Sequence, residues 1–410
     1  MILTNCAACA VPLPHPAKQC SRCKTRYCGP ACQEQHWKAG THDQLCRKIK
    51  KGGGAEQYHA NKKCKEAVAV AVEACRGRHE GQKCYICLEA VHPRTGEGLV
   101  RGCACGDRDG VSSPELGVAH VSCLADQAKI LVAEAEDNNL DGKVQNERFN
   151  RWHTCGLCEQ RHHGVVSCAL GWACWKTYLG RPENDWRRMN AMTVLGNGLH
   201  DGNDPEGALP VREATLSTYR RLGVSAEASL IVQGNLAGTY QALGRLEEAL
   251  RIRRDVYSAR LRLDGEEDGE TIREANNYAM SLMDLQRYQG GKSLLRRQIP
   301  VARRVLGDSS EITLSMRWMY ATALINTGGA TLDNLREGVT TLEEIEGIAR
   351  RVLGSTHPTA VALGVSLEQS RAVLAARETP RGVGVEDDDD DEDGWETVSS
   401  EEAPTEAISS

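Results

Sequence analysis

All 18 cysteines of this 410-residue chain lie before residue 175, and the rest of the chain contains none. Most of them form pairs separated by one to three residues. The first residues lack the basic start and long apolar run of a secretory leader, so we expect an intracellular protein, cytoplasmic and/or nuclear. In such a reducing compartment, paired cysteines are metal ligands rather than disulfides. The cysteines therefore predict that only the first part of the chain folds around metal ions.

The first 46 residues contain eight potential ligands in four short pairs: Cys6, Cys9, Cys20, Cys23, Cys28, Cys32, His42 and Cys46. Zinc takes four thiolate or imidazole ligands in a tetrahedron, so eight ligands make two closed sites. His36 lies four residues after Cys32 and would share a helical face with it. His42, however, forms a compact pair with Cys46, and this spacing favours His42 as the eighth ligand.

The stretch YCGPACQEQHW, followed by H-x3-C, resembles the MYND zinc finger over Cys6–Cys46. In that family the residue before the tryptophan, here His36, is not a ligand. The resemblance implies a module that docks proline-containing peptides and in which alternate pairs share an ion. One zinc would be held by Cys6, Cys9, Cys28 and Cys32, and the other by Cys20, Cys23, His42 and Cys46.

A second series of eight ligands follows in the order four cysteines, one histidine, three cysteines: Cys84, Cys87, Cys103, Cys105, His120, Cys123, Cys155 and Cys158. The stretches CYICLE, CAC, AHVSCL and CGLCEQ resemble the RING-CH (RING-variant) family. A PHD finger has the same ligand order and is the alternative. Two details favour RING-CH: only one residue separates the two cysteines of CAC, and Trp152 lies three residues before Cys155. Interleaving would give one zinc to Cys84, Cys87, His120 and Cys123, and the other to Cys103, Cys105, Cys155 and Cys158.

RING-CH domains act as ubiquitin ligases by positioning a ubiquitin-conjugating enzyme and its thioester-linked ubiquitin against a substrate lysine. The resemblance therefore implies a conjugating enzyme as partner, Ile86 as its apolar contact, and no catalytic residue in this chain. Between Cys123 and Cys155, the segment LADQAKILVAEAEDNN predicts a helix. His162 and His163, after the last pair, are expected to be exposed. The four cysteines outside the two series are expected to be small buried residues: Cys64, Cys75, Cys168 and Cys174.

From about residue 183 the chain repeats with a period near 42: GNLAGTYQALGRLEEAL, NNYAMSLMDLQRYQGGK and WMYATALINTGG begin 42 residues apart. Such a period indicates stacked helix pairs that bury their apolar faces against one another. The units resemble tetratricopeptide (TPR) repeats of the kinesin-light-chain kind over 183–376. We count four repeats and a final helix, Thr359–Arg377. Pro210 and Pro300 lie late in second helices, where proline should kink the helix or delay its start.

The TPR resemblance implies a peptide groove in which Asn235 and Asn277 clamp a peptide backbone, beside arginines such as Arg253 and Arg254. The alternative is that these asparagines bond within the helix stack. The final segment, VEDDDDDEDGWETV and beyond, is too charged to fold. Its only aromatic residue, Trp395, is flanked by acids, as in cargo peptides of kinesin-light-chain repeats. An acidic-aromatic peptide is thus an expected partner, and the tail itself is a candidate; docking on ubiquitin-like autophagy proteins and simple solubilisation are the alternatives.

The sequence predicts a mostly α protein with two small binuclear zinc modules, an α-helical TPR solenoid, a disordered acidic tail and four Zn²⁺ ions. No run of about 18 apolar residues predicts a membrane span, and nucleic acid is not an expected partner. One hypothesis is a RING-type ubiquitin-protein transferase whose other modules select substrate; the other is a non-enzymatic adaptor. The expected units are a MYND-type zinc finger (1–50), a helical linker (51–80), a RING-CH-like zinc finger (81–165), a helical connector (166–182), TPR-like repeats (183–378) and the tail (379–410).

Overall fold

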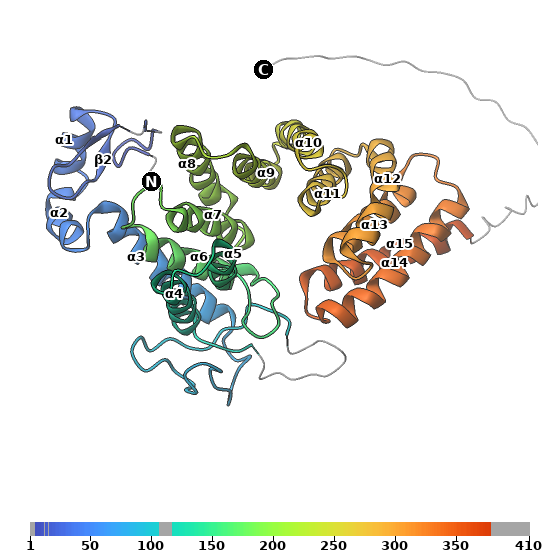
Figure 1. Ribbon diagram of the computed structural model, residues 1–410, viewed down its shortest axis with the longest axis horizontal. Helices are drawn as coiled ribbons and strands as arrows, with labels where there is room; N and C mark the ends of the chain where they lie inside the picture. The colour runs from blue at the N-terminus through green and yellow to red at the C-terminus, as the bar shows by residue number, and fades with distance from the viewer. Residues whose placement is uncertain (1–4, 12, 15, 106–116, 379–410) are drawn as a thin grey trace, which may run out of the picture.

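The computed structural model describes residues 5–11, 13–14, 16–105 and 117–378. The expected tail and Trp395 lie outside the described residues. Two zinc modules and a curved array of helices make up this part of the chain (Figure 1). Among the described residues, no helix is long and apolar enough to cross a membrane.

The first zinc module is built from two short strands and two helices. Strands β1 (Lys18–Gln19) and β2 (Arg26–Tyr27) pair antiparallel. Helix α1 (Pro30–Lys38) begins with a proline, whose missing N–H would have no partner in the first turn. Helix α2 (His42–Lys51) follows after a break at Gly40 and Thr41. Tyr27 is fully buried and packs among the cysteines, and together they form the small core of the module.

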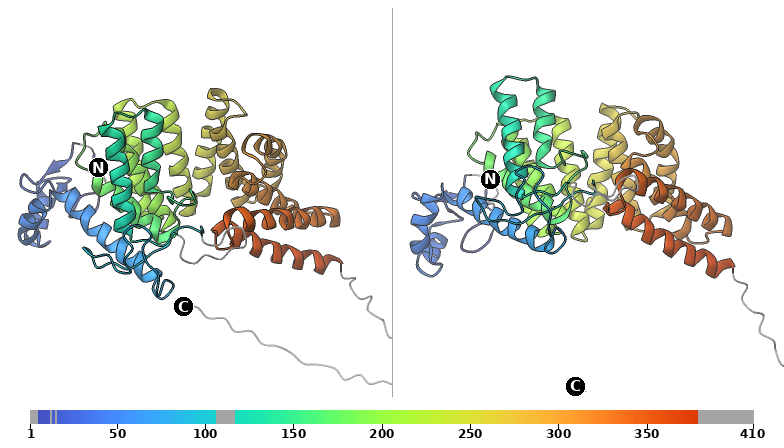
Figure 2. Two further views of the ribbon diagram at one scale, coloured as in Figure 1. Left: turned by 60° about the horizontal axis from the view of Figure 1, so that its bottom comes forward. Right: turned by 90° about the horizontal axis from the view of Figure 1, so that it is seen from below.

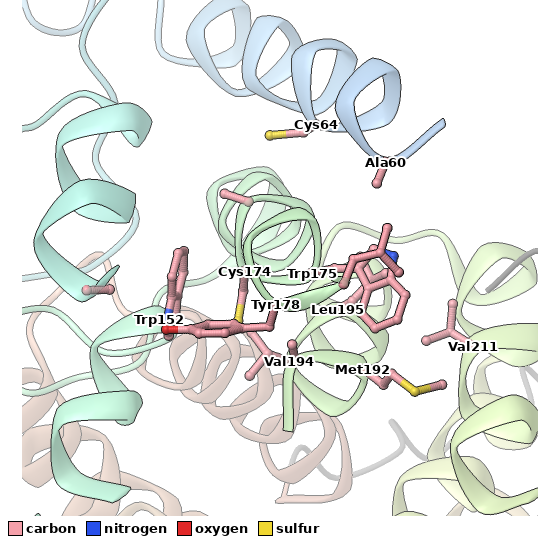
Figure 3. Close-up of a cluster of buried hydrophobic side chains, with 14 of the residues drawn as sticks. Ala60, Cys64, Trp152, Cys174, Trp175, Tyr178, Met192, Val194, Leu195 and Val211 are labelled. Atoms are coloured by element: carbon pink, nitrogen blue, oxygen red, sulfur yellow. Dashed lines mark hydrogen bonds between the residues drawn. The ribbon is translucent and has the colours of Figure 1, made fainter. Parts of the chain in front are cut away.

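Two long helices join the modules. Helix α3 (Ala55–Ala74) leads away from the first zinc module and packs along α6 (Gly164–Tyr178) (Figure 2). Helix α6 is apolar on nearly all sides and is therefore buried, as such a composition requires. The expected burial of Cys64 and Cys174 is confirmed, since both lie in the largest apolar core beside Trp175 (Figure 3).

The second zinc module contains α4 (Val121–Asp137), α5 (Gly142–Phe149) and the 3-10 helix η2 (Asn150–Trp152). The helix predicted from LADQAKILVAEAEDNN is thus confirmed as α4. Antiparallel bridges join Val100 to Ala119 and Thr154 to Arg161. Phe149 and Trp152 are buried in the same core as α6, where the Trp152 indole N–H donates to the Tyr178 hydroxyl at 3.3 Å (Figure 3).

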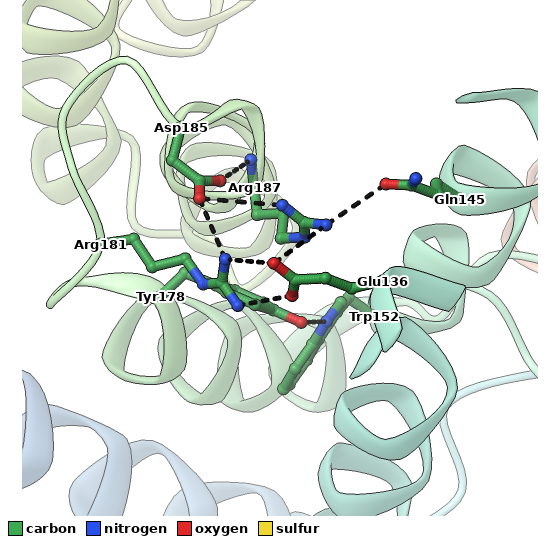
Figure 4. Close-up of polar contacts among 7 residues, drawn as sticks. All are labelled: Glu136, Gln145, Trp152, Tyr178, Arg181, Asp185 and Arg187. Carbon is green, nitrogen blue, oxygen red and sulfur yellow. Dashed lines mark hydrogen bonds and ion pairs between the residues drawn. The ribbon is translucent and has the colours of Figure 1, made fainter. Parts of the chain in front are cut away.

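A polar network fastens the second zinc module to the first helix of the solenoid. Arg181 donates to Glu136 of α4 at 2.7 Å and to Asp185 at 3.1 Å, and Arg187 donates to Gln145 of α5 at 3.3 Å (Figure 4). The Asp185 carboxylate also accepts the backbone N–H of Arg187 at the start of the next helix. Because Arg187 and Asp185 are largely shielded from water, this network contributes more to stability than an ordinary surface ion pair does.

The remaining helices form four antiparallel pairs and a final helix, as predicted. Each helix packs against the next, and α7, α9 and α11 lie on the inner side of the arc while α8 and α10 lie outside (Figure 1). Ala237, Ala279 and Ala321 recur every 42 residues and are fully buried where helices approach closely. The helices are α7 (Trp186–Asp201), α8 (Pro205–Leu222), α9 (Ala226–Ala242), α10 (Leu246–Leu263), α11 (Gly269–Asp284), α12 (Tyr288–Leu306), α13 (Glu311–Asn326), α14 (Leu332–Leu353) and α15 (Pro358–Glu378).

Neither proline within the solenoid delays the start of its helix. Pro210 lies inside α8 and Pro300 inside α12, and both helices start before the proline and continue past it. A proline removes only one hydrogen bond of the helix, and packing on both neighbouring helices offsets that loss. The prediction that they delay the helix start is therefore wrong.

The far end of the solenoid contacts the second zinc module. The Gln160 side chain donates to the carbonyl of Leu353 at 2.7 Å, and the rings of His163 and His357 meet edge to face at 4.9 Å. His162 is only 2 % exposed. The expectation that His162 and His163 are exposed is wrong, because α6 and the end of the solenoid cover them.

Candidate functional site

The sixteen predicted ligands gather into four groups of four, paired as the interleaved arrangement requires. Within each group the ligand atoms lie within 4.8 Å of one another. A Zn–S bond of about 2.3 Å implies sulfur separations near ~3.8 Å in a tetrahedron, so the groups fit zinc. Four Zn²⁺ ions, two per module, match these donor sets, which are Cys6, Cys9, Cys28 and Cys32; Cys20, Cys23, His42 and Cys46; Cys84, Cys87, His120 and Cys123; and Cys103, Cys105, Cys155 and Cys158.

The structure brings His42, and not His36, into the first module's buried ligand group. The Nε2 atom of His42 lies 3.4 Å from the sulfur of Cys23, and His42 itself is only 1 % exposed. His36 instead shares a 3.0 Å hydrogen bond with the Tyr27 hydroxyl, and its ring packs against that of His42. His36 therefore helps to position His42, the histidine that faces the thiols.

The other ligand group of the first module is more open to solvent. Cys9 and Cys28 are exposed, and their sulfurs are 3.7 Å apart. Cys32 lies in the first turn of α1, whereas Cys28 precedes that helix. His42 and Cys46 of the other group, by contrast, both lie on α2.

In the second module, His120 is oriented from both sides of its ring. Its Nδ1 atom lies 3.4 Å from the sulfur of Cys87 and 3.6 Å from that of Cys123, and its Nε2 atom is 3.4 Å from the carbonyl of Ala90. Such a second contact fixes the tautomer of a metal-bound histidine. His120 stands just before α4, so this helix sets the position of the imidazole.

Both Cys-x2-Cys loops of the second module point backbone N–H groups at sulfur. The N–H of Ile86 lies 3.4 Å from the sulfur of Cys84, and that of Leu157 lies 3.4 Å from the sulfur of Cys155. Burial opposes ionisation of the Cys84 thiol, but the surrounding backbone N–H groups bring its pKa below the usual value. The loops thus favour the thiolate form that a metal ligand needs.

The two metal-binding loops and α4 meet on one side of the second module. A β-carbon on Gly156 would lie 3.6 Å from the Tyr85 hydroxyl and 3.6 Å from the Gln127 side chain. Next to this junction, Leu157 is half exposed. Ile86 is half-buried and packs against an apolar cluster formed by residues of α3, α4 and α6. Its role as a contact for a conjugating enzyme stays a prediction.

In the solenoid, Asn235 and Asn277 lie half-buried on the inner helices α9 and α11. The Asn277 amide contacts the Glu274 carboxylate at 3.4 Å, which is a bond within the stack. Their role in clamping a peptide stays a prediction. Arg253 extends inward from α10, whereas Arg254 is exposed and contacts Asp255.

Sequence reasoning missed Arg212, which occupies the same place in its repeat as Arg253. Both are less than 10 % exposed, and a β-carbon on Gly238 of α9 would lie 3.8 Å from Arg212 Nη1 and 3.1 Å from Arg253 Nη2. The two guanidinium groups therefore converge on one point of the inner helix α9. The spacing of 41 residues between them was the signal that could have revealed this pair.

The two arginines differ in the carboxylates that lie near them. Arg253 lies 3.5 Å from the buried carboxylate of Glu274, whose pKa is raised by burial. Among the described residues, no carboxylate lies within ion-pair distance of Arg212, which donates only to Gly196 O and Asn197 Oδ1, both at 3.3 Å. Burial, together with the charge of Arg253, lowers the pKa of Arg212 to about 10. A buried cation without a carboxylate is costly and favours a bound anion.

Comparison with known families identifies the first zinc module. The sequence model of the MYND finger matches residues 6–46, which confirms that predicted resemblance. No curated protein matches the chain. The resemblance of the second module to RING-CH stays a prediction.

Solved structures similar to this chain contain TPR-like repeats. Two crystal structures of nearly identical TPR-like repeats from a putative kinesin light chain of Podosopora anserina, one of them a variant, each share 20% identity with a TM-score of 0.39. They cover 46% and 48% of this chain and 88% and 90% of their own. BtubC (BKLC) from P. vanneervenii shares 11% identity with a TM-score of 0.34, over 68% of this chain and 99% of its own. The repeat architecture here follows from the helix pairs themselves.

Proposed function

We propose that this protein is an adaptor that holds an acidic segment of a partner on the inner side of its solenoid. A zinc finger of a protein-binding type and a TPR-like solenoid together support a binding role. The observation that carries the proposal is the convergence of Arg212 and Arg253 at Gly238. A carboxylate at this point would supply the partner that Arg212 lacks, through a charge-assisted hydrogen bond.

Glycine at position 238 is informative because it lies inside a helix. Glycine in a helix interior costs about 1 kcal/mol relative to alanine. Gly234, one turn earlier, would place a β-carbon 3.3 Å from Arg253 and 3.0 Å from Glu274. Both glycines therefore leave room for side chains that extend inward from α8 and α10. The cost is consistent with an inner surface shaped for a ligand rather than for maximal helix stability.

The test is binding of a fluorescein-labelled peptide spanning Asp387–Ser400 to the full-length protein, followed by fluorescence anisotropy at low and high salt. We expect salt-sensitive binding that Arg212→Gln weakens at least tenfold. Arg254→Gln removes the same charge from an exposed side chain and serves as the control, with little effect expected. Absence of binding at low salt, with the helical circular dichroism signal intact, would contradict the proposal.

A second candidate function is ubiquitin ligation, and the junction of both metal-binding loops with α4 favours it. Conjugating enzymes would dock through apolar side chains there, and Leu157 is exposed beside the junction. We expect Leu157→Ala and Ile86→Ala to abolish self-ubiquitination while four zinc ions stay bound. Val70→Ala, at an exposed position on α3, is the control. A wild-type protein that is inactive with every conjugating enzyme in a panel would leave only the adaptor function.

A further inference from the structure

A small polar pocket lies where the second zinc module meets the first repeat. Its volume is about 120 Å³, and its walls come from α5, η2 and the following loop on one side and from α6 and α7 on the other. Six of its lining side chains are Asn146, Asn150, His153, Arg161, Asn190 and Asn197. Four carboxamides around one small space offer both hydrogen-bond donors and acceptors to a ligand.

The solenoid side of the pocket belongs to the inner side of the arc. Asn190 and Asn197 are seven residues apart on α7 and therefore lie on one face of this inner helix. Asn197 also accepts a hydrogen bond from Arg212 at 3.3 Å. The pocket is thus next to the two converging arginines described above, at the beginning of the same inner surface.

The zinc-module side is positioned by the loop that carries Cys155 and Cys158. The antiparallel bridge between Thr154 and Arg161 closes this loop and places Arg161 at the pocket. Arg161 forms no ion pair with any of the described residues. His153, on the other arm of the loop, has a buried Nδ1 atom without a hydrogen-bond partner. The metal loop therefore presents the exposed guanidinium of Arg161, free to pair with a carboxylate, and one unsatisfied polar atom to the same space.

The electrostatic balance of the pocket is positive. Arg161 is close enough to contribute to the lowered pKa of Arg212, after burial and Arg253. Asp201 is close enough to offset part of this positive charge at Arg212. Its carboxylate accepts the Ser167 hydroxyl at 2.8 Å and does not line the pocket, whose one charged lining residue in the described part of the chain is Arg161. A carboxylate brought by a ligand would pair with Arg161, and the carboxamides would bond the N–H and C=O groups of the adjoining backbone.

We propose that this pocket is a composite subsite that binds an aspartate or glutamate side chain of an extended peptide, with Arg161 and Asn150 supplied by the zinc module and Asn190 and Asn197 by the first repeat. The proposal rests on the peptide-binding function proposed above. The volume of about 120 Å³ is large enough for one carboxylate side chain. The peptide groove thereby extends beyond the repeats onto the second zinc module.

The experiment uses the full-length protein and the labelled peptide Asp387–Ser400, with affinity measured by fluorescence anisotropy. Every protein compared carries amides in place of all the acids of its own tail, so that the tail does not compete with the labelled peptide. Arg161→Gln should weaken binding about tenfold, which is the loss of one charge-assisted hydrogen bond, and should reduce its salt dependence. Asn150→Ala should weaken it severalfold. Arg148→Gln removes a charge from the same module outside the pocket and should bind as the wild type does. Zinc content and circular dichroism verify that each variant is folded.

A second peptide, with every aspartate and glutamate replaced by its amide, should not bind, and Arg161→Gln should then make no difference. If the acidic peptide binds the wild type and both pocket variants equally, while Arg212→Gln weakens binding, the composite subsite is refuted and the adaptor function stands. If the wild type does not bind the acidic peptide at low salt, both proposals are refuted together.

Discussion

Replacing Gly238 by alanine should leave the solenoid at least as stable while weakening its binding of an acidic peptide. The new β-carbon would lie 3.1 Å from Arg253 Nη2 and 3.8 Å from Arg212 Nη1. The first distance is shorter than an ordinary van der Waals contact, so the Arg253 guanidinium must move by a few tenths of an ångström. The end of an arginine side chain moves at little cost, and alanine gains about 1 kcal/mol of helix propensity over glycine.

The effect on binding follows from the same geometry. The methyl group would occupy the point at which the two guanidinium groups converge, so a carboxylate could no longer reach both of them. A hydrogen bond to a charged group contributes about 1.5–3 kcal/mol, and its loss should weaken binding at least tenfold, given that about 1.4 kcal/mol corresponds to a factor of ten. Anisotropy with the peptide Asp387–Ser400 measures the affinity, and urea unfolding measures the free energy of unfolding.

Gly347→Ala is the matched control for this experiment. Gly347 lies inside α14, and a β-carbon there would meet nothing within 4 Å. It should gain the same helix propensity without any change in peptide affinity. Undiminished peptide binding by Gly238→Ala would refute the assignment of the two arginines to the ligand. A large loss of stability would refute the packing described around Gly238.

Three further outcomes are expected. His42→Ala should lose zinc from the first module while His36→Ala keeps all four ions, as measured by metal analysis of the purified protein; loss of metal only on changing His36 would reverse the assignment. Phe149→Ala should lower the free energy of unfolding by about 3–5 kcal/mol, because Phe149 packs between Tyr178 and Trp186 in the main core; a loss below ~1 kcal/mol in urea unfolding would contradict that packing. Burial, with Arg212 nearby, lowers the pKa of His200, so the folded state binds this proton less tightly than the unfolded chain. The free energy of unfolding should therefore fall as the pH drops below about 6.5, the ordinary pKa of histidine, towards the lowered pKa of His200. In urea unfolding with zinc in excess, His200→Gln should lose less of this free energy than the wild type between pH 7.5 and about 5.5. Identical losses would exclude His200 as the cause.

The ligand groups were predictable because zinc geometry acts over short stretches of chain. Two residues between cysteines, or three between His42 and Cys46, define pairs that can share an ion. The resemblance to interleaved zinc-finger families implied which pairs share an ion, and the structure groups them in that way. The repeats were predictable for a similar reason, since each helix pair contacts mainly its neighbours in the sequence. The prediction of a delayed helix start failed at Pro210 and Pro300, where packing outweighs the loss of one helical hydrogen bond.

The functional surfaces were harder to predict from the sequence. Arg212 and Arg253 belong to outer helices, and nothing local shows that their side chains extend inward past Gly238. The small pocket joins Asn150 and Arg161 of a zinc module to Asn190 of the first repeat, which requires the two units to pack together. That packing depends on buried residues such as Phe149, whose partners lie on other helices.

The sequence by itself determined the zinc-ligand pairs and the stacked helical repeats, because both arise from contacts between residues close together in the chain. Only the tertiary structure decided that the end of the solenoid returns to the second zinc module. Gln160 meets Leu353 there, and His163 meets His357, across nearly 200 residues. Each repeat adds a small rotation to the one before it, so the position of the last helix is the sum of all the packing angles, and no local pattern encodes that sum.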